Sequence, residues 1–287
     1  MVRDKEGMIG TTDNARGIKG KVLTLADKQR ESLDTLKNLR AFCEKENITY
    51  FLAYGTLLGA VRHKGFIPWD DDVDVMIPRP DYERLLSAYR DETERFRLIS
   101  CFTDNNYNLP YAKLDNLQTA RLKKDGAPDS RGIGIDLFPL DGIPGDIRAA
   151  EKMFKRQNHK FLNLINRFST YSLMPADSTA NMIRLLAGKA VLFTGFVNKT
   201  ARQIGRKMYT EDYDDCPVVA CVTGIHSGRF IPFDREWFNS KKMEFEGELF
   251  NCPCGYDEVL KKIYGDYMVI PPEADRRSTH TEVFVWR

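Results

Sequence analysis

Four aspartates occupy positions 70 to 74 of this chain, directly before an apolar run. Asp70, Asp71, Asp72 and Asp74 precede Val-Met-Ile at positions 75–77, a sequence typical of a buried strand. Like charges beside a buried strand repel one another and lose hydration, so packing alone gives no reason for this cluster. A divalent cation removes that cost, and Mg²⁺ prefers a few carboxylates together with phosphate oxygens and water. The cluster therefore indicates a metal-dependent site that handles phosphate.

Strand alternation selects which of these carboxylates converge. In a strand every second residue faces the same side, so we expect Asp70, Asp72 and Asp74 to project together. An EF-hand calcium loop uses similar spacing, but Val75 stands at its glycine position and Asp81 at its closing glutamate. The alternative, a solvated acidic turn, leaves the apolar run unexplained.

A glycine turn lies upstream of the aspartates. Gly55 and Thr56 follow residues 48–53 (ITYFLA), whose β-branched and aromatic character predicts a strand. We expect Gly55 to end that strand and Thr56 to cap a short helix. Such a turn points backbone N–H groups at an anion, although many similar turns only connect elements. Together with an acidic strand it indicates a nucleotide-phosphate site.

Basic and aromatic side chains fill the loop between the turn and the acids. Arg62 can grip phosphate with two hydrogen bonds, and Lys64 supplies a point charge. His63 titrates near neutrality and can accept a proton from an attacking hydroxyl. Trp69 can stack on a base or wall the pocket. A solvated loop and ordinary packing are the alternatives for these residues.

Two later acids and one lysine complete the candidate set. Asp136 is the one acid in the apolar segment at 133–138 (IGIDLF), so it needs a partner or a metal unless it faces solvent. We predict that it is a third metal carboxylate. Asp141, just past this strand, offers the same chemistry. Lys113 begins another predicted strand and can pair with phosphate or lie at the surface.

Helices and strands must position these residues. Leu33, Leu36, Leu39 and Cys43 recur at spacings of three and four, which predicts a helix over 26–45. We expect strands at 73–77, 96–101, 112–117, 133–138, 218–222 and 243–245, helices at 56–61, 81–86 and 256–264, and a turn at 140–144. From 146 to 213 strand signals vanish and basic helical patterns take over.

Composition excludes some classes of protein. The 43 basic and 41 acidic residues nearly balance, which gives no argument for nucleic-acid binding. No stretch reaches the roughly 18 apolar residues of a membrane span. The first ten residues lack the apolar core of a signal peptide, so we expect a cytoplasmic protein.

The stretch from Tyr54 to Asp74 resembles the signature of the LicD family, which includes bacterial phosphorylcholine transferases and is related to the fukutin proteins. Similarity continues through residues 112–114 with Thr119, residues 135–144 and 264–272, and Arg277 with His280 as a closing Arg-x-x-His. The resemblance implies an α/β (α+β) fold, a nucleotidyltransferase-like mixed sheet flanked by helices. Together with the composition along the chain, it divides the chain into a flexible N-terminus (1–20), a catalytic core (21–145), a helical insertion (146–215) and a C-terminal part that completes the core (216–287).

The resemblance also implies a reaction. A phospho-alcohol, with phosphocholine expected, passes from a CDP-activated donor to a hydroxyl of a cell-surface glycan or teichoic acid precursor, and CMP is released. Asp72 and Asp74 match the metal-binding pair, Asp136 matches the third acid, and Gly55 with Thr56 matches the donor-phosphate turn. The expected cofactor is Mg²⁺, with Mn²⁺ as an alternative. Asp70 or His63 would accept the proton.

Other donors and reactions stay open. CDP-ribitol and CDP-glycerol are alternative donors; a quaternary ammonium would favour an aromatic cage, for which Tyr107, Tyr111, Trp237 and Tyr267 are candidates. The pattern Asp72-Val-Asp74 also occurs in metal-dependent glycosyltransferases, although only one helix and one strand precede the turn here. A nucleotidylyltransferase shares the same carboxylates. A lipid-linked glycan acceptor would bring the basic helical region to the inner membrane face.

Overall fold

The structure is a computed structural model, and it describes residues 21–122, 128, 131–143, 145–156, 177–206, 213–223, 229–277 and 282–287. The N-terminus expected to be flexible, 1–20, lies outside the described residues. So do residues 157–176 of the expected helical insertion, and His280.

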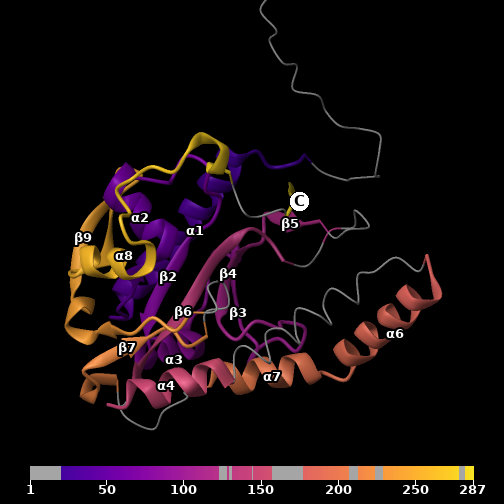
Figure 1. Ribbon diagram of the computed structural model, residues 1–287. Coiled ribbons are helices and arrows are strands. Elements are labelled where there is room, and N and C mark those ends of the chain that lie inside the picture. Colours follow the sequence, from indigo (N-terminus) through magenta and orange to yellow (C-terminus); the bar gives the residue numbers. More distant parts are fainter. Residues whose placement is uncertain are drawn as a thin grey trace, which may run out of the picture.

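A mixed seven-stranded sheet forms the centre of the protein (Figure 1). Strand β2 runs parallel to β6, and the other neighbouring pairs are antiparallel. The order is β1 (Phe51–Leu52), β2 (Asp74–Pro78), β6 (Gly134–Ile143), β4 (Ala112–Asn116) and β3 (Phe96–Ile99), with β7 (Val218–Ala220) joining the end of β6 and β8 (Phe233–Asp234) pairing with β7. Two smaller sheets pair β9 (Ser240–Phe245) with β10 (Glu248–Pro253) and β5 (Thr119–Arg121) with β11 (Phe284–Trp286). The α/β class expected from the sequence is confirmed.

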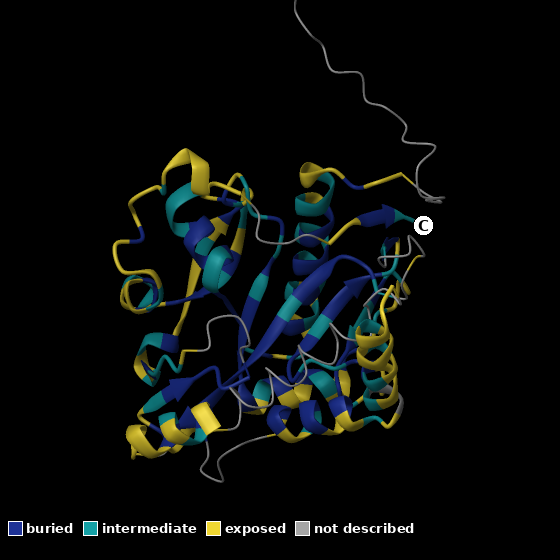
Figure 2. Cartoon of the chain, turned by 45° about the vertical axis from the view of Figure 1, so that its right-hand side comes forward, coloured by how far each residue is buried: buried dark blue, intermediate teal, exposed yellow. Residues whose placement is uncertain are grey.

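Helices surround this sheet. Helix α1 packs over β4 and β6, and α3 packs over β2 and β6. In Figure 2 the central strands are largely buried, whereas the helices expose one side to solvent. The α-helices are α1 (Leu25–Lys45), α2 (Tyr54–His63), α3 (Arg79–Ala88), α4 (Ile147–Phe154), α6 (Thr179–Phe193), α7 (Phe196–Gly205) and α8 (Tyr256–Tyr264), and short 3₁₀ turns lie at Tyr213–Asp215, Arg235–Phe238 and Glu273–Asp275.

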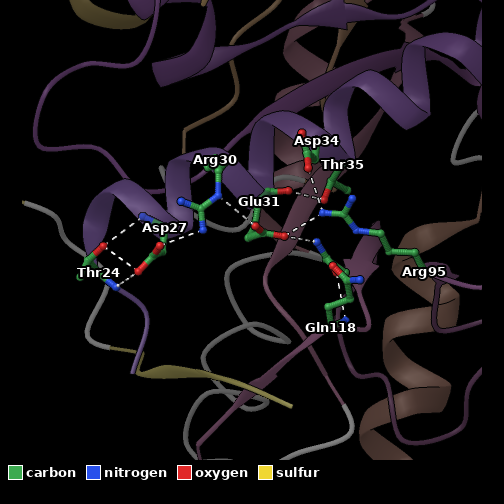
Figure 3. A network of polar contacts seen from close by, with 9 residues as sticks. Thr24, Asp27, Arg30, Glu31, Asp34, Thr35, Arg95 and Gln118 are labelled. Atoms are coloured by element: carbon green, nitrogen blue, oxygen red, sulfur yellow. Dashed lines mark hydrogen bonds and ion pairs between the residues drawn. The ribbon is translucent and has the colours of Figure 1, made fainter. Parts of the chain in front are cut away.

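Helix α1 matches its predicted span. Thr24 and Asp27 form a capping box at its start, and Leu36, Leu39 and Cys43 are fully buried. Figure 3 shows the polar network that ties this helix to the sheet. Glu31 accepts hydrogen bonds from Arg95 of the segment before β3 (2.8 Å) and from the side chain of Asn116 in β4 (2.9 Å). The helix is therefore held by both apolar burial and buried hydrogen bonds.

Strand β6 is longer than predicted. The turn expected at 140–144 is wrong, because residues 141–143 continue the strand and pair with β7. Asp141 was expected near a substrate, but both of its carboxylate oxygens bind the buried Arg79 of α3, at 2.6 and 2.8 Å. The same guanidinium donates to the carbonyl of Gly205 in α7. This bidentate pair joins three elements and is separate from the acidic cluster.

Helix α2 begins two residues earlier than predicted. Tyr54 is its first residue and Ala53 its N-cap, so Gly55 lies in the first helical turn and Thr56 is not the cap. The loop after α2 runs back along the helix, over two glycines one turn apart. A β-carbon at Gly59 would collide with the carbonyl oxygen of Gly65, and one at Gly55 would lie 2.7 Å from Asp70 Oδ2. The loop can therefore approach the middle of α2 only because Gly59 lacks a side chain, whereas at Gly55 the flexible Asp70 side chain is the close neighbour.

Among the described residues, no single helix is long and apolar enough to cross a membrane. Residues 179–191 of α6 and α7 pass that test of length and composition only together, and they meet at a bend of 55°.

We predict that Gly59→Ala destabilises the fold by about 1–3 kcal/mol, because the added methyl group must displace the backbone at Gly65. Urea unfolding followed by circular dichroism measures this effect. Gly145→Ala is the matched control, since no atom lies within 4 Å of a β-carbon there. Equal stability of the two variants would contradict the close approach of loop and helix.

Candidate functional site

The site begins where β2 and β6 lie side by side. Asp74 and Asp136 are register partners in this parallel pair, and the backbone N–H of Asp136 donates to the carbonyl of Val73 (2.9 Å). Neighbouring strands lie about 4.8 Å apart, so the pairing places two half-buried carboxylates next to each other. Two of the three predicted metal ligands are thus brought together from positions 62 residues apart.

The start of α2 adjoins Asp74. The backbone N–H of Asp74 donates to Thr56 Oγ1 (2.9 Å), and the N–H of Ala53 donates to the carbonyl of Asp74 (3.0 Å). Tyr54 has a φ of +44°, a conformation that costs a residue with a β-carbon about 1 kcal/mol. The N-terminal end of α2, with its partial positive charge, therefore lies beside the acids.

A loop, not a strand, brings Asp70 and Asp72 to this place. Both residues precede β2, so strand alternation was the wrong reason for their grouping. The loop packs on the glycines of α2 and sets the Asp70 carboxylate against Gly55. Glu246, in the turn between β9 and β10, accepts a hydrogen bond from the N–H of Phe66 (2.9 Å) and so helps to hold the loop.

Asp71 points elsewhere. Its carboxylate is buried and forms an ion pair with Lys28 of α1, with 2.7 Å between Nζ and Oδ2. One member of the acidic run is therefore a structural anchor between the loop and α1.

The clustered charges shift the protonation of Asp74. Burial raises the pKa of Asp74 well above its ordinary value, and the carboxylates of Asp72, Asp136 and Asp70 raise it further, while Lys113 opposes them. The ionised form of Asp74 is therefore costly in the free protein. A bound cation would relieve this cost.

Lys113 lies within the same group of charges. It is the register partner of Asp136 across β4 and β6, and its Nζ lies 3.0 Å from Asp136 Oδ1. Burial lowers the pKa of Lys113, but Asp136 and Asp115 outweigh that effect, so the pKa is raised overall. The side chain is only about one-fifth exposed, at 21%, so the alternative of a surface lysine is wrong.

The described residues partly fit a metal ion. They contain no group of three Asp, Glu, His or Cys side chains already arranged to hold an ion. The predicted set of Asp72, Asp74 and Asp136 is thus not converged in this structure. Mg²⁺ needs only one or two carboxylates when substrate phosphates and water complete its shell. Asp74 and Asp136 meet that requirement, and Asp136 Oδ1 is buried beside the Lys113 ammonium, which lies 3.0 Å away.

Tyrosines wall the acidic group. Tyr54 and Tyr111 both pack their rings on Phe138, with centroids 5.5 and 4.5 Å away. Burial raises the pKa of Tyr111, and Asp136 adds to the shift. Tyr264 of α8 is 44% exposed, and its partial burial, followed by Asp74, Asp70 and Asp72, raises the pKa of its hydroxyl. Neither Tyr54 nor Tyr264 was predicted from the sequence. The only signal for Tyr54 was its place directly before Gly55.

The four aromatic residues considered for a choline-binding cage have different surroundings in the structure. Tyr107 and Tyr111 are buried, and the charge of Asp136 acts on both hydroxyls. Trp237 instead stacks under Lys262 (4.9 Å), and the Tyr267 hydroxyl donates to Asp257 (2.7 Å). Neither of these two contacts involves the acidic group.

The basic cluster lies at the other end of α2. With a rise of 1.5 Å per residue, His63 lies about 12 Å along the helix from Gly55. Arg62 donates to the carbonyl of Tyr267 (2.7 Å) and to His63 Nε2 (3.0 Å). Burial, followed by the charge of Arg62, lowers the pKa of His63. Lys64 is exposed.

Two further predicted binding residues, Trp69 and Arg277, have contacts with neighbours other than the acids. The ring of Trp69 lies edge-on to His63, with centroids 6.5 Å apart, and Arg276 lies 5.8 Å from it. Arg277 is exposed, and its backbone N–H donates to the carbonyl of Asp275 (3.0 Å). His280 lies outside the described residues, so the proposed Arg-x-x-His pair stays a prediction.

Comparisons with known proteins agree with this architecture. Residues 47–174 match the family described as LicD/FKTN/FKRP, nucleotidyltransferase domain. Lipopolysaccharide cholinephosphotransferase LicD of Haemophilus influenzae is 31% identical over 271 residues, which cover 91% of this chain and 98% of that protein. The chain belongs to the LicD family of phosphotransferases. The matched residues include α2, together with β2, which carries Asp74, and β6, which carries Asp136.

Shorter stretches of this chain are similar to two uncharacterized proteins. One, from Rickettsia prowazekii, is 34% identical over 82 residues, 29% of this chain and 27% of that protein. The other, from Rickettsia typhi, is 39% identical over 70 residues, 23% of each chain.

One further acid lies two residues from Lys113. Asp115 of β4 is fully buried, and Arg97 of β3 approaches only to 4.0 Å. Burial raises the pKa of Asp115 to about 6, against the opposite effects of Lys113, Arg131 and Arg97. Lys113 and Asp115 share one face of the strand, and the Asp115 carboxylate raises the pKa of Lys113. Asp115 therefore affects the site through its effect on Lys113.

We predict that Asp115→Asn changes how stability depends on pH. In the native protein Asp115 binds a proton below about pH 6, whereas in the unfolded chain it does so only below about pH 4. Its contribution therefore weakens as pH rises from 4 through 6, by about 1–3 kcal/mol. Asp115→Asn removes this loss, so its stability relative to the parent increases between pH 4.5 and 7.5 in urea titrations.

The control for this experiment is Glu92→Gln, because the Glu92 side chain is 85% exposed. Its stability relative to the parent should be the same at both pH values. If the stability of Asp115→Asn relative to the parent were also the same at both pH values, the raised pKa of Asp115 would be contradicted.

Proposed function

We propose that this protein transfers phosphocholine from CDP-choline to a hydroxyl of a cell-surface glycan, such as a lipopolysaccharide or teichoic acid precursor, and releases CMP. The observation that carries the proposal is the in-register pair Asp74 and Asp136 beside the N-terminal end of α2. Similarity to a named cholinephosphotransferase over nearly the whole chain supports phosphocholine as the group transferred.

The donor diphosphate would lie at the start of α2. Backbone N–H groups in the first turn, around Gly55 and Thr56, would donate to its oxygens. Asp74 and Asp136, with Asp72 nearby, would hold Mg²⁺ or Mn²⁺. Once bound, this ion would neutralise charge on the diphosphate and on the departing CMP. Lys113 would add positive charge from the side of Asp136.

The reaction exchanges one phosphorus–oxygen bond for another. The acceptor oxygen attacks the phosphorus that carries choline, and the bond from that phosphorus to the CMP oxygen breaks. We assign Asp70 as the group that takes the acceptor proton, because its carboxylate lies against Gly55. His63 is the weaker candidate, since it lies at the other end of α2 and its Nε2 already accepts from Arg62.

Aromatic rings would recognise the choline group. A quaternary ammonium favours aromatic faces, and nearby carboxylates add attraction. Tyr54, Tyr107, Tyr111 and Tyr264 are tyrosines whose hydroxyl pKa the acids raise in addition to burial. They replace Trp237 and Tyr267 as our candidates for this contact.

Two neighbouring acids should show opposite behaviour when changed to asparagine. Asp74→Asn should reduce transfer about 10³-fold or more, yet raise the melting temperature without divalent cation, because its ionised form is costly. Asp71→Asn should keep transfer but lose about 1–3 kcal/mol of stability with the Lys28 ion pair. CMP release and thermal melts measure both. A folded Asp74→Asn protein with most of its activity would refute the assignment.

Donor choice can be tested directly. Thermal shifts with CDP-choline, CDP-ribitol and CDP-glycerol, each with and without Mg²⁺, should be largest for CDP-choline with Mg²⁺. CMP should then appear in the presence of an acceptor glycan. Release of UDP or GDP from a sugar nucleotide would instead indicate a glycosyltransferase, and pyrophosphate from CTP would indicate a nucleotidylyltransferase. A larger shift with CDP-ribitol or CDP-glycerol would overturn the choline assignment alone.

A further inference from the structure

Helix α6 presents large apolar side chains to solvent. Met182, Ile183 and Leu186 are 42%, 62% and 59% exposed. At 100° per residue they fall within one arc of about 100° on the helix, and Gly188, on the other side, is buried. Figure 1 shows α6 at the edge of the molecule, beyond α7. We call these three residues the α6 stripe.

Such a stripe indicates a surface that contacts something other than water. Single exposed apolar residues are ordinary, but neighbouring ones on a single helix face mark interaction sites. The first residue of α7, Phe196, is also 44% exposed. A further large apolar side chain is therefore exposed where the two helices meet.

The same helix pair is strongly basic. Residues 178–206 contain no Asp or Glu and five cationic residues, namely Arg184, Lys189, Lys199, Arg202 and Arg206. Lys199, Arg202 and Arg206 line a cavity of about 860 Å³ along α7. Arg202 is partly engaged, because it donates to Asn105 Oδ1 (2.7 Å), whereas Lys199 and Arg206 are exposed.

An apolar stripe combined with cations and no acids fits an anionic bilayer. Interfacial helices bury their apolar residues at the boundary of headgroups and acyl chains, and Lys and Arg attract lipid phosphates. We propose that α6 and the start of α7 form a docking surface for an anionic lipid membrane. This proposal rests on the proposed function in one respect: docking would bring the enzyme to a glycan acceptor that is attached to the membrane.

Vesicle flotation tests this surface. The full-length protein should float with vesicles that contain phosphatidylglycerol, should bind poorly to pure phosphatidylcholine, and should dissociate as salt increases. The double variant Ile183→Asp/Leu186→Asp should bind at least about 100-fold more weakly, because two large apolar side chains no longer enter the membrane. Leu249→Asp is the matched control, since Leu249 of β10 is equally exposed, at 57%, outside the helix pair.

Charge is tested separately. Lys189→Gln/Lys199→Gln should weaken binding about 10–30-fold at low salt, on the basis of about 1 kcal/mol for each cation near the surface. Both residues are exposed, so the fold should be unaffected. Circular dichroism checks that each variant is folded.

The outcomes separate docking from catalysis. Docking predicts that the Ile183→Asp/Leu186→Asp protein still transfers to a soluble, delipidated glycan but transfers less to the same glycan in vesicles. The docking surface is overturned if the parent does not bind vesicles. It is also overturned if the double variant binds them as well as the parent does. A parent dimer that the variant converts to monomer, seen by light scattering, would also overturn it, in favour of self-association. Stripe-dependent flotation without transfer from any CDP-alcohol would leave docking standing and refute the proposed function.

Discussion

The in-register parallel pairing of β2 with β6 is the constraint on which the site depends. It fixes Asp74 and Asp136 on adjacent strands, where the Asp136 carboxylate disfavours the charge of Asp74. The hydrogen bonds of the sheet and the apolar residues that follow in both strands hold this arrangement against repulsion. Lys113 and the start of α2 supply positive charge around the pair. Because repelling carboxylates lie next to positive charge, the site is suited to bind a cation and a diphosphate.

Helix α2 connects the charged site to the loop that carries Asp70, Asp71 and Asp72. The loop after the helix turns back over Gly59 and Gly55, and this return places Asp70 beside the first helical turn. The loop is therefore a device that adds carboxylates to a site built by two strands. Its own anchors lie outside the site, at Glu246 of the β9–β10 turn and at Lys28 of α1.

Strand β6 shows how neighbouring acids acquire different roles. Asp136 and Asp141 are five residues apart, so regular alternation places them on opposite faces of the strand. Asp136 faces the acidic group, and Asp141 closes a buried ion pair with Arg79. Both looked like candidate ligands in the sequence, because a lone acid in an apolar run needs some partner. Which partner it has depends on the helix that packs on that face.

Much of this protein follows from the sequence alone. Periodicity placed α1 and α8, apolar runs placed β2 and β4, and the acids with the glycine turn indicated phosphate chemistry, because these signals are local. The tertiary structure decided the rest. It paired Asp74 with Asp136, separated Asp71 and Asp141 into structural ion pairs, and moved His63 to the far end of α2. It also placed Tyr54 and Tyr264 beside the acids. These outcomes depend on strand register and loop path, which are set by contacts between residues distant in the chain.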